Sequence, residues 1–447
     1  MLRSAKNTQE NKYRFYRSKN TIMTDITAVI LAAGKGTRME SDQPKVLHEV
    51  AGKAMIRHVL DTCKAAGIKD IVLVAGDNHR RLKDFTSPVY NHIKYVIQKP
   101  QLGTAHAILK VFQSKKPLKS GILIINGDVP SVEPGTLRNL INRFTKKRLN
   151  GIICSAKIKN PFGYGRIIKN TQGYISRIVE EKDAGPSEKA IKEINGGIYV
   201  FKKQDLKDYI VKIRKNEAKQ EYYLTDIAGL MSADNKKIES FNIIPEEIQG
   251  INDRIQLMEI SKVKRRKILE KLARSGVTIE DFDTAFIDEN VKIGKDTVIR
   301  PFTVIKGRTI IGKKCSIGPF SHIRPETVIG DSTNIGNYVE VKKSKIGNHV
   351  HVAHLSYIGD TEIGDGTNIG AGTITANYDG VKKNKTKIGK NVSVGSDVVF
   401  RAPVTIGDNA VIGAGSIITD SVPAGSLAIA RARQVTKKDW MKRRNKK

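Results

Sequence analysis

The sequence predicts an α/β Rossmann-like domain, a connecting helix and then a left-handed parallel β-helix made of hexapeptide repeats. Three observations support this prediction. Short apolar runs alternate with amphipathic stretches from Ile26 to about Gly250. A segment without Pro or Gly follows at residues 253–274. After Gly276 an aliphatic residue recurs at every sixth position over about 130 residues, which is the signature of stacked coils.

The N-terminal part reads as repeated strand–helix units. Val59, Cys63 and Ala66 lie at helical spacing between the first two apolar runs. Alternation of this kind predicts βαβ units and a mostly parallel sheet. The expected strands include Val29–Ala32, Asp70–Val74, Gly121–Ile125 and Gly197–Phe201.

The connecting segment predicts one long helix that ends at Gly276. Its apolar positions are Ile255, Met258, Val263, Leu269 and Leu272. Its run of Arg and Lys predicts a solvated helix face.

The C-terminal part carries the hexapeptide repeat. About 22 hexads predict about seven three-sided coils, with one aliphatic side chain per face pointing inward. The register slips by one residue at Ile346 and Ile363, and residues 376–387 interrupt it, which predicts a loop that leaves the coil. The expected inward residues are Ile287, Ile293, Ile299, Ile305, Ile311, Ile317, Ile323, Ile329, Ile335, Val341, Ile388, Val394, Phe400, Ile406, Ile412 and Ile418.

Composition predicts a soluble, cytoplasmic protein. Of the 447 residues, 39% are hydrophobic and 28% are charged, and no apolar run is long enough to span a bilayer. Residues 1–22 are polar and basic without an apolar centre, so they predict a disordered extension rather than a secretory signal, with Met23 as a candidate start. Three isolated cysteines indicate neither a disulfide framework nor a CxxC metal site, which fits a reducing compartment.

The net charge of +33 would attract phosphorylated substrates and other polyanions. A generally lysine-rich composition would give the same excess without any function. We find no nucleic-acid-binding motif and no basic stripe interleaved with aromatic residues, so we expect neither a nucleic acid nor a membrane partner. The predicted organisation is a basic extension at 1–22, an α/β domain at 23–250, a linker helix at 251–276, a β-helix domain at 277–436 and a basic tail at 437–447.

The first motif is VILAAGKGTRMESDQPK, at residues 29–45. A strand that ends in Gly-rich backbone exposes N–H groups able to cradle phosphate oxygens. Gly34 and Gly36 allow close approach, while Arg38 and Lys45 add positive charge. The motif lacks the spacing of a P-loop, and Met39 occupies the third glycine position of a dinucleotide fingerprint.

Two further stretches fit a nucleotide site. Gln98 offers an amide that can recognise a base edge, beside a tight turn at Gly103-Thr104. Asn126, Gly127 and Asp128 follow an apolar strand. An Asp at the carboxyl end of a strand in an open sheet is well placed to hold Mg²⁺, although a lone Gly-Asp is more often an ordinary turn.

The complete string LAAGKGTRM…PK resembles the signature of sugar-nucleotide pyrophosphorylases. With the β-helix and the order of the parts, the chain from about Thr24 onward is similar to the bacterial bifunctional UDP-N-acetylglucosamine pyrophosphorylase/glucosamine-1-phosphate N-acetyltransferase family. The resemblance implies that UTP and N-acetylglucosamine 1-phosphate are bound by Leu31, Ala32, Ala33, Gly34, Lys45, Gln98, Gly103, Thr104, Asn126, Gly127, Asp128, Gly165, Glu180, Asn195 and Asn252. It implies that Asp128 and Asn252 bind Mg²⁺ and that Arg38 and Lys45 act on the phosphates. No covalent nucleophile is needed, because positioning, metal and cations neutralise the developing charge.

The β-helix carries residues for a second site. His349, His351 and His354 lack zinc spacing with a fourth ligand, and a lone repeat histidine more often supports a turn than catalyses. By resemblance, however, His354 matches the general base that takes a proton from the attacking amine. Glucosamine 1-phosphate would bind to Arg324, Lys342, Tyr357, Asn368, Asn377 and Tyr378, with Glu340 as a supporting polar residue. Acetyl-CoA would contact Ala371, whose N–H faces the thioester oxyanion, and Ser396, Ala414 and Arg431.

The resemblance also implies a homotrimer with active sites between subunits. The stretch between Asn252 and Arg324 is short by about two coils, or ~36 residues, and the tail beyond Arg431 is brief. The missing coils precede the acetyltransferase motifs, so we expect both activities to survive. Two alternatives are a single-activity sugar-1-phosphate nucleotidyltransferase with a scaffold β-helix, and a polyanion-binding protein.

Overall fold

The computed structural model describes residues 23–217 and 220–444; the basic extension predicted at 1–22 and the last three residues of the tail lie outside the described residues. The chain forms two compact units, with the division between Ser261 and Lys262. Each unit has its own hydrophobic core.

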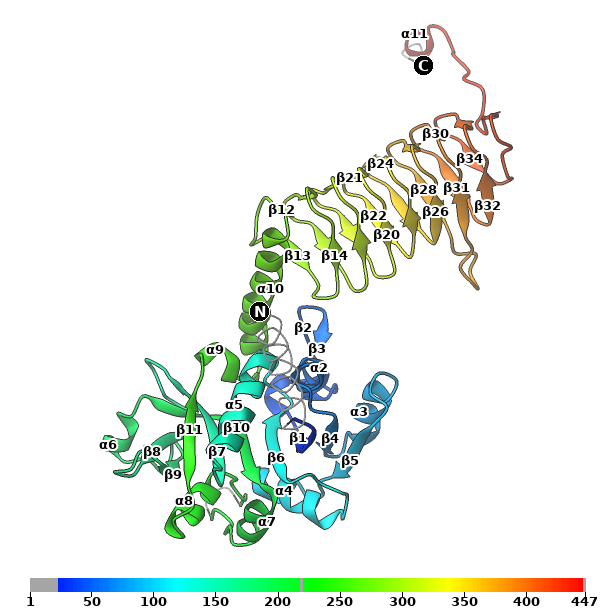
Figure 1. Ribbon diagram of the computed structural model, residues 1–447. Helices are drawn as coiled ribbons and strands as arrows, with labels where there is room; N and C mark the ends of the chain where they lie inside the picture. Colours follow the sequence, from blue (N-terminus) through cyan, green and yellow to red (C-terminus); the bar gives the residue numbers. More distant parts are fainter. Residues whose placement is uncertain (1–22, 218–219, 445–447) are drawn as a thin grey trace, which may run out of the picture. The chain divides into compact units, whose positions relative to one another are not determined.

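The N-terminal unit is built on a mixed, mostly parallel sheet (Figure 1). β1 lies inside the sheet and pairs in parallel with β4 and β6, whereas β10 is antiparallel to β6 and β7. The strands in sheet order are β11 (Ile238–Asn242), β7 (Gly151–Lys157), β10 (Glu193–Lys202), β6 (Gly121–Asn126), β1 (Ile26–Ala32), β4 (Asp70–Ala75) and β5 (Ile93–Ile97), with β8 (Arg166–Lys169) and β9 (Ile175–Val179) beside β10. The strand–helix alternation therefore predicted the central sheet, and each expected strand is present with slightly longer bounds.

Helices cover both faces of this sheet, so its central strands are apolar on both sides. In β1, Ala28 and Ile30 face one core cluster and Val29 faces the other. The helices of this unit are α2 (Met55–Ala66), α3 (His79–Thr86), α4 (Thr104–Gln113), α5 (Pro134–Lys146), α6 (Pro186–Lys189), α7 (Lys203–Ile210), α8 (Asp226–Ala233) and α9 (Pro245–Ile248), with short η1 (Thr37–Met39), η2 (Lys45–Leu47) and the hairpin β2 (Glu49–Val50) and β3 (Lys53–Ala54).

Helix α10 (Arg254–Arg274) joins the two units, as the Pro- and Gly-free segment predicted. Its C-terminal end belongs to the β-helix unit, where Leu269 is fully buried in the β-helix core. The guanidinium of Arg265 lies 4.0 Å from the ring centroid of Phe286, so part of the basic run stacks on an aromatic ring rather than only facing solvent.

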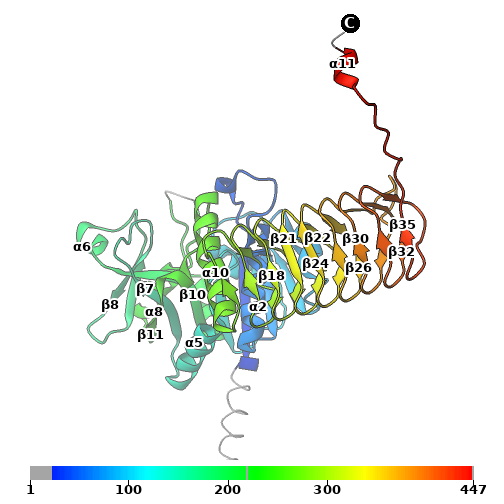
Figure 2. The ribbon, with the colours of Figure 1, turned by 90° about the horizontal axis from the view of Figure 1, so that it is seen from above.

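The C-terminal unit is a three-sided parallel β-helix whose coils stack along one axis (Figure 2). Its faces contain nine, eight and seven strands. The first face comprises β12 (Thr278–Ile279), β15 (Val298–Ile299), β18 (Ser316–Ile317), β21 (Asn334–Asn337), β24 (His351–His354), β27 (Asn368–Ile369), β30 (Ser393–Val394), β33 (Val411–Ile412) and β35 (Leu427–Ala428). The second comprises β13 (Phe286–Ile287), β16 (Val304–Ile305), β19 (His322–Ile323), β22 (Glu340–Lys342), β25 (Tyr357–Gly359), β28 (Ile374–Ala376), β31 (Val399–Arg401) and β34 (Ile417–Ile418). The third comprises β14 (Lys292–Ile293), β17 (Ile310–Ile311), β20 (Val328–Ile329), β23 (Lys345–Ile346), β26 (Thr361–Ile363), β29 (Thr386–Ile388) and β32 (Val404–Ile406).

The hexapeptide period determines which side chains enter the core. The predicted inward residues are buried, apart from the half-buried Ile293 near the first coil. Corner residues recur at the same six-residue interval with left-handed φ angles, including Asp296, Phe302 and Lys314. Such corners let each short strand turn onto the next face.

The predicted loop is present between β28 and β29. Tyr378 and Lys383 pair across it as an isolated bridge. Past the last coil, the tail carries α11 (Trp440–Arg444), with the Lys437 ammonium 5.2 Å from the Trp440 ring centroid. All three cysteines are free and buried. Within the described residues, no helix has the length and apolarity that a bilayer crossing requires.

Candidate active sites

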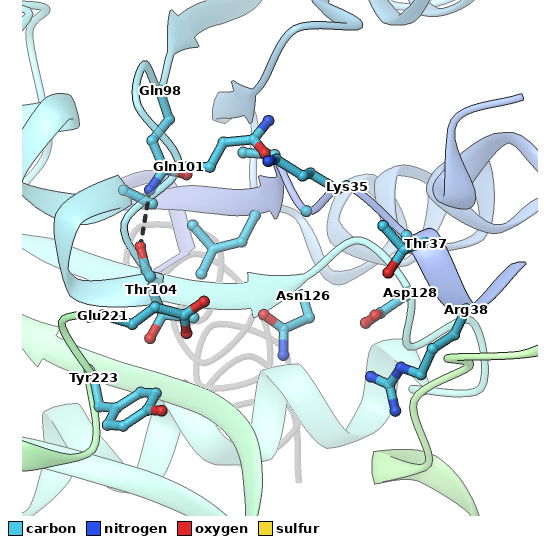
Figure 3. Close-up of a pocket in the computed structure, with 16 residues that line it drawn as sticks. Lys35, Thr37, Arg38, Gln98, Gln101, Thr104, Asn126, Asp128, Glu221 and Tyr223 are labelled. Carbon is cyan, nitrogen blue, oxygen red and sulfur yellow. Dashed lines mark hydrogen bonds between the residues drawn. The ribbon is translucent and has the colours of Figure 1, made fainter. Parts of the chain in front are cut away.

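A cavity of about 580 Å³ lies at the carboxyl ends of β1 and β6, where ligands bind in open α/β sheets (Figure 3). Asn126 and Asp128 lie between a basic side, with Lys35 and Arg38, and a side that carries Gln98 and Tyr223. The full lining is Leu31, Ala33, Gly34, Lys35, Gly36, Thr37, Arg38, Gln98, Gln101, Gly103, Thr104, Ala107, Asn126, Asp128, Glu221 and Tyr223. A smaller adjoining cavity is lined by Ala32 and Lys45 as well.

The glycine-rich turn after β1 brings Lys45 close to the strand end. Gly36 has a φ of 66°, and a Cβ at this position would lie 2.7 Å from the Cβ of Lys45. Only glycine fits both demands without strain. At Gly34 a Cβ would meet nothing within 4 Å, so the backbone there is open to a ligand.

Four predicted side chains converge on one point at the mouth of β1 and β6. The Lys45 ammonium lies 2.5 Å from an Asp128 carboxylate oxygen and donates to the Asn252 side-chain oxygen at 3.0 Å. Arg38 donates to the same Asn252 oxygen at 3.2 Å. The backbone N–H of Ile251 donates to the Asp128 carbonyl at 3.0 Å, which holds Asn252 beside Asp128 although the two are far apart in sequence.

The Asp128–Asn252 pair suits a magnesium ion that substrate phosphates complete. Among the described residues there is no group of three or more His, Cys, Asp or Glu side chains that could hold a metal ion. Mg²⁺ is commonly held by one or two protein oxygens together with waters and phosphates. The two oxygens already face the ammonium group of Lys45, so the donor set accommodates a cation.

On the opposite side of the cavity, Gln98 is only 3% exposed and rigidly held. Its amide N–H groups donate to the Gly103 carbonyl at 2.9 Å and to Nδ1 of His106 at 3.2 Å. Burial, followed by the charge of Lys110, lowers the pKa of His106 and keeps its ring neutral, as an acceptor from Gln98 must be. The Thr104 hydroxyl accepts the Leu224 N–H at 3.0 Å, which closes the turn.

Of the predicted sugar-binding residues, Glu180 lines a neighbouring cavity of about 480 Å³, whereas Gly165 and Asn195 are not part of its lining. Tyr223 lines both cavities. The Thr225 hydroxyl donates to Glu180 at 3.0 Å. Gly165 lies against Glu180, because a Cβ at Gly165 would come within 3.5 Å of its carboxylate. The Asn195 amide donates to the Tyr199 hydroxyl at 2.8 Å.

An ion pair between a buried arginine and a half-buried glutamate supports the loop predicted to bind the sugar. Arg166 is 1% exposed and lies 2.6 Å from Glu181, which also accepts the Gly163 N–H at 3.1 Å. The hydrogen bond from Arg166 holds the pKa of Glu181 below its usual range. Sequence analysis did not single out this pair, because its function in the fold depends on the approach of two strands.

On the β-helix, His354 ends β24 at the corner between the first and second faces. Its Nδ1 lies 2.8 Å from Oδ1 of Asn337 on the preceding coil. Glu340, predicted as a supporting polar residue, lies with its carboxylate 2.8 Å from Arg324. Asn337 was missed, because only the coil pairing brings it beside His354.

The next corner of the same coils gathers cations. Arg324 directly follows β19, and Lys342 ends β22 on the adjacent coil. Lys383 from the protruding loop, which sequence analysis also missed, is the main cause of a lowered pKa at Lys342, with contributions from desolvation and the charge of Arg324. Asn377 donates to the Tyr357 hydroxyl at 3.5 Å, while Tyr378 is bonded within the loop. Arg324, Lys342 and Lys383 thus gather at this corner, where Glu340 pairs with Arg324 and the charge of Asp360 acts on Lys342.

Asn368 lies elsewhere on the coil. It pairs in register with His351, at the opposite end of β24 from His354, and with Ser393 of β30. Within one chain it is therefore separated from the Arg324–Lys342 corner.

The predicted acetyl-CoA residues form a column on successive coils. The Asp397 N–H donates to the Ala371 carbonyl at 2.7 Å, and the Gly415 N–H donates to the Ser396 carbonyl at 2.8 Å. Ala414 packs on Gly395, and Arg431 lies beside Gly415 on the following coil. The four residues Ala371, Ser396, Ala414 and Arg431 therefore line one corner of the helix.

Comparison with known proteins agrees with both halves. Residues 28–172 match the MobA-like NTP transferase domain, residues 385–420 match the bacterial transferase hexapeptide repeats, and residues 305–401 match the GMPPB C-terminal domain. A solved apo UDP-glucose pyrophosphorylase structure covers 54% of this chain and 98% of its own, at 18% identity and a TM-score of 0.46.

Relatives cover almost the whole chain. The bifunctional protein GlmU of Clostridium kluyveri is 42% identical over 93% of this chain and 98% of its own length. The bifunctional protein GlmU of Staphylococcus haemolyticus is 42% identical over 93% of this chain and 99% of its own length. The one of Caldanaerobacter subterraneus subsp. tengcongensis is 42% identical over 95% of this chain and 99% of its own length. The chain therefore belongs to the GlmU family of bifunctional enzymes, with the uridylyltransferase and acetyltransferase halves that its motifs predicted.

Proposed function

We propose that the N-terminal unit transfers UMP from UTP to N-acetylglucosamine 1-phosphate in the cavity at the ends of β1 and β6. Both N–H groups of the Gln98 amide are bonded within the protein, so its fixed oxygen, beside the turn at Gly103 and Thr104, would accept a hydrogen bond from the uracil ring N–H. The open backbone at Gly34 would receive the triphosphate. Glu180, which lines the adjoining cavity, and Asn195 would hold the sugar hydroxyls.

In this reaction a phosphate oxygen of the sugar attacks the α-phosphorus of UTP, the bond to the β-phosphate breaks, and pyrophosphate leaves. Lys45 and Arg38 would neutralise the charge that develops on the phosphoryl oxygens. Asp128 and Asn252 would hold Mg²⁺, which would supply further charge neutralisation when bound. The convergence of these four side chains on one point supports the assignment.

We further propose that the β-helix acetylates glucosamine 1-phosphate. The cations Arg324, Lys342 and Lys383 would bind the phosphate, which relieves the mutual repulsion that lowers the pKa of Lys342. His354 would take a proton from the sugar amine as the nitrogen attacks the thioester carbon. The carbon–sulfur bond then breaks and the thiol of coenzyme A leaves. The column from Ala371 to Arg431 would bind the cofactor along the helix axis.

The single observation that best supports the second activity is the gathering of Arg324, Lys342 and Lys383 at the corner next to that of His354, because stacking of the coils does not require three cations in one place. A pair of variants separates the two activities. Asp128→Asn should reduce UDP-N-acetylglucosamine formation by at least about a hundredfold and leave thiol release from acetyl-CoA intact. His354→Ala should do the reverse. Parallel loss of both activities in either variant would contradict two independent sites.

We also propose a homotrimer. The rings of Phe302, Phe320 and Tyr338 stack on three successive corners, with centroids 4.8 and 5.2 Å apart. The three side chains are 51%, 44% and 56% exposed. They form an apolar ridge that would be covered by packing against a second copy of the chain. Sedimentation of the wild type should give three times the 49.5 kDa chain mass. Phe320→Asp should lower the measured mass toward that of a single chain. A monomeric wild type with full acetyl transfer would contradict this assembly.

Soluble substrates and three reduced, buried cysteines support a cytoplasmic location.

A further inference from the structure

The pairing of two coils gives His354 a neutral partner. Strands β21 and β24 run parallel with Asn337 opposite His354. The pairing is fixed by the backbone, since the Leu355 N–H donates to the Asn337 carbonyl at 3.0 Å. The neighbouring Gly336 packs so closely that a Cβ there would lie 1.9 Å from the Ala353 carbonyl oxygen. The two coils therefore cannot slip past each other without breaking this contact.

An amide oxygen accepts hydrogen bonds and cannot donate them. The 2.8 Å contact from Nδ1 of His354 to Oδ1 of Asn337 therefore requires the proton of the neutral ring to reside on Nδ1. The lone pair is then on Nε2, on the opposite side of the ring. We propose that Asn337 is a positioning residue for acetyl transfer: it fixes the His354 tautomer whose Nε2 accepts the proton of the attacking amine. This inference rests on the proposed role of His354 as the general base.

Asn337 is a neutral amide, and the strands around the His354 ring bring no unpaired carboxylate to its Nδ1. The charged or titratable side chains on the strands around the ring are His351 on β24, Glu340 and Lys342 on β22 and Tyr357 on β25. Glu340 is paired with Arg324, and β21 and β27 present only neutral residues beside His354. A carboxylate bonded to Nδ1 would place a negative charge beside the ring, whereas the Asn337 amide orients the ring without adding charge.

The test compares three variants by the pH dependence of thiol release from acetyl-CoA with glucosamine 1-phosphate. Asn337→Leu removes the acceptor at nearly constant volume, so kcat should fall about thirtyfold while KM for the sugar phosphate stays within about twofold. Asn337→Asp retains an acceptor and adds charge, so it should keep most of the maximal rate but move the acidic limb of the profile upward by about one pH unit.

Asn334→Leu is the matched control, because Asn334 lies on the same strand opposite His351. It should leave the rate and the profile unchanged. Preserved uridylyl transfer and melting temperature in all three variants would show that the fold is intact. The inference is overturned if Asn337→Leu retains wild-type kcat, or if Asn337→Asp loses as much activity as Asn337→Leu with no shift of the acidic limb.

The proposed function and this inference can fail separately. A wild type that releases no thiol contradicts the acetyltransferase assignment itself. An active wild type with an inactive His354→Ala and a fully active Asn337→Leu contradicts only the function of Asn337.

Discussion

The ammonium group of Lys45 lies between Asp128 and Asn252, at 2.5 Å and 3.0 Å from their oxygens. It therefore occupies the position that the proposed magnesium ion would take. The side chain cannot serve the metal ligands and the triphosphate at once. Metal binding should release Lys45 toward the phosphates, where its charge acts on the reaction.

Lys45→Met should consequently have opposite effects on metal affinity and catalysis. Removing the competing cation should tighten Mn²⁺ binding to the nucleotide-free protein about tenfold. Removing the phosphate contact should lower kcat for uridylyl transfer by about a hundredfold. Free Mn²⁺ can be measured by electron paramagnetic resonance, independently of turnover.

Lys53→Met is the control, since Lys53 pairs with Asp61 at 2.6 Å on α2, outside the lining of the cavity. It should leave Mn²⁺ affinity unchanged. Weaker Mn²⁺ binding in Lys45→Met would show that Lys45 does not compete with the metal.

The ion pair between the buried Arg166 and the half-buried Glu181 should control affinity for the sugar. Glu181→Gln weakens the hydrogen bonds that hold Gly163 and Arg166, so KM for N-acetylglucosamine 1-phosphate should rise about tenfold with little change in kcat. Glu188→Gln offers the comparison, because Glu188 pairs at the same 2.6 Å with an exposed arginine, Arg177. Steady-state kinetics would give KM for N-acetylglucosamine 1-phosphate in both variants. Equal KM values in Glu181→Gln and Glu188→Gln would contradict a positioning function for the Arg166–Glu181 pair.

Buried histidines should make the first unit less stable in acid. Burial lowers the pKa of His106, and burial with the charge of Arg254 lowers that of His48, whereas unfolded histidine titrates near pH 6.5. Below about pH 6.5 the unfolded chain therefore binds protons that the folded unit does not, so the free energy of unfolding falls until the folded rings titrate.

Urea unfolding at several pH values tests this dependence. His106→Gln should reduce the slope between about pH 6.5 and 5.5, leaving the part due to His48. His92→Gln, at an exposed histidine, should not change it. An unaltered slope in His106→Gln would contradict the proposed neutral state of the ring in the folded protein.

The protruding loop should contribute to phosphate binding through Lys383. Lys383→Met should raise KM for glucosamine 1-phosphate about tenfold and leave kcat nearly unchanged, because the lysine contacts the phosphate rather than the amine. Lys385→Met on the same loop is the matched control, since Lys385 is 73% exposed and lies 3.9 Å from Glu362. Equal KM values for the two variants would contradict a function of Lys383 in phosphate binding.

Local periodicity explains why so much of the fold was predictable. Each inward side chain of the β-helix, such as Ile317 or Ile335, is set by the six-residue interval alone. The strand that ends at Ala32 and the glycines after it could likewise be recognised from local sequence alone. They position the backbone that we propose binds phosphate. Lys45, Asp128 and Asn252 were named from motifs, and the sheet brings them together as expected at its carboxyl edge.

The missed residues depend on pairings that no local pattern contains. A full coil of 18 residues would place Gly336 opposite His354. The one-residue slip before Ile346 shortens the coil, so Asn337 occupies that position instead. Lys383 returns to the helix only through the fold of its loop, and Arg166 becomes buried only where β8 meets β9 and β10.

Thiol release from acetyl-CoA with glucosamine 1-phosphate, measured for the wild type and for His354→Ala, tests the account most directly. We predict a robust wild-type rate that falls by at least about a hundredfold in the variant, as expected for loss of a general base, while uridylyl transfer persists. A folded wild type without thiol release, or a His354→Ala variant with an undiminished rate, would contradict acetyl transfer by this β-helix.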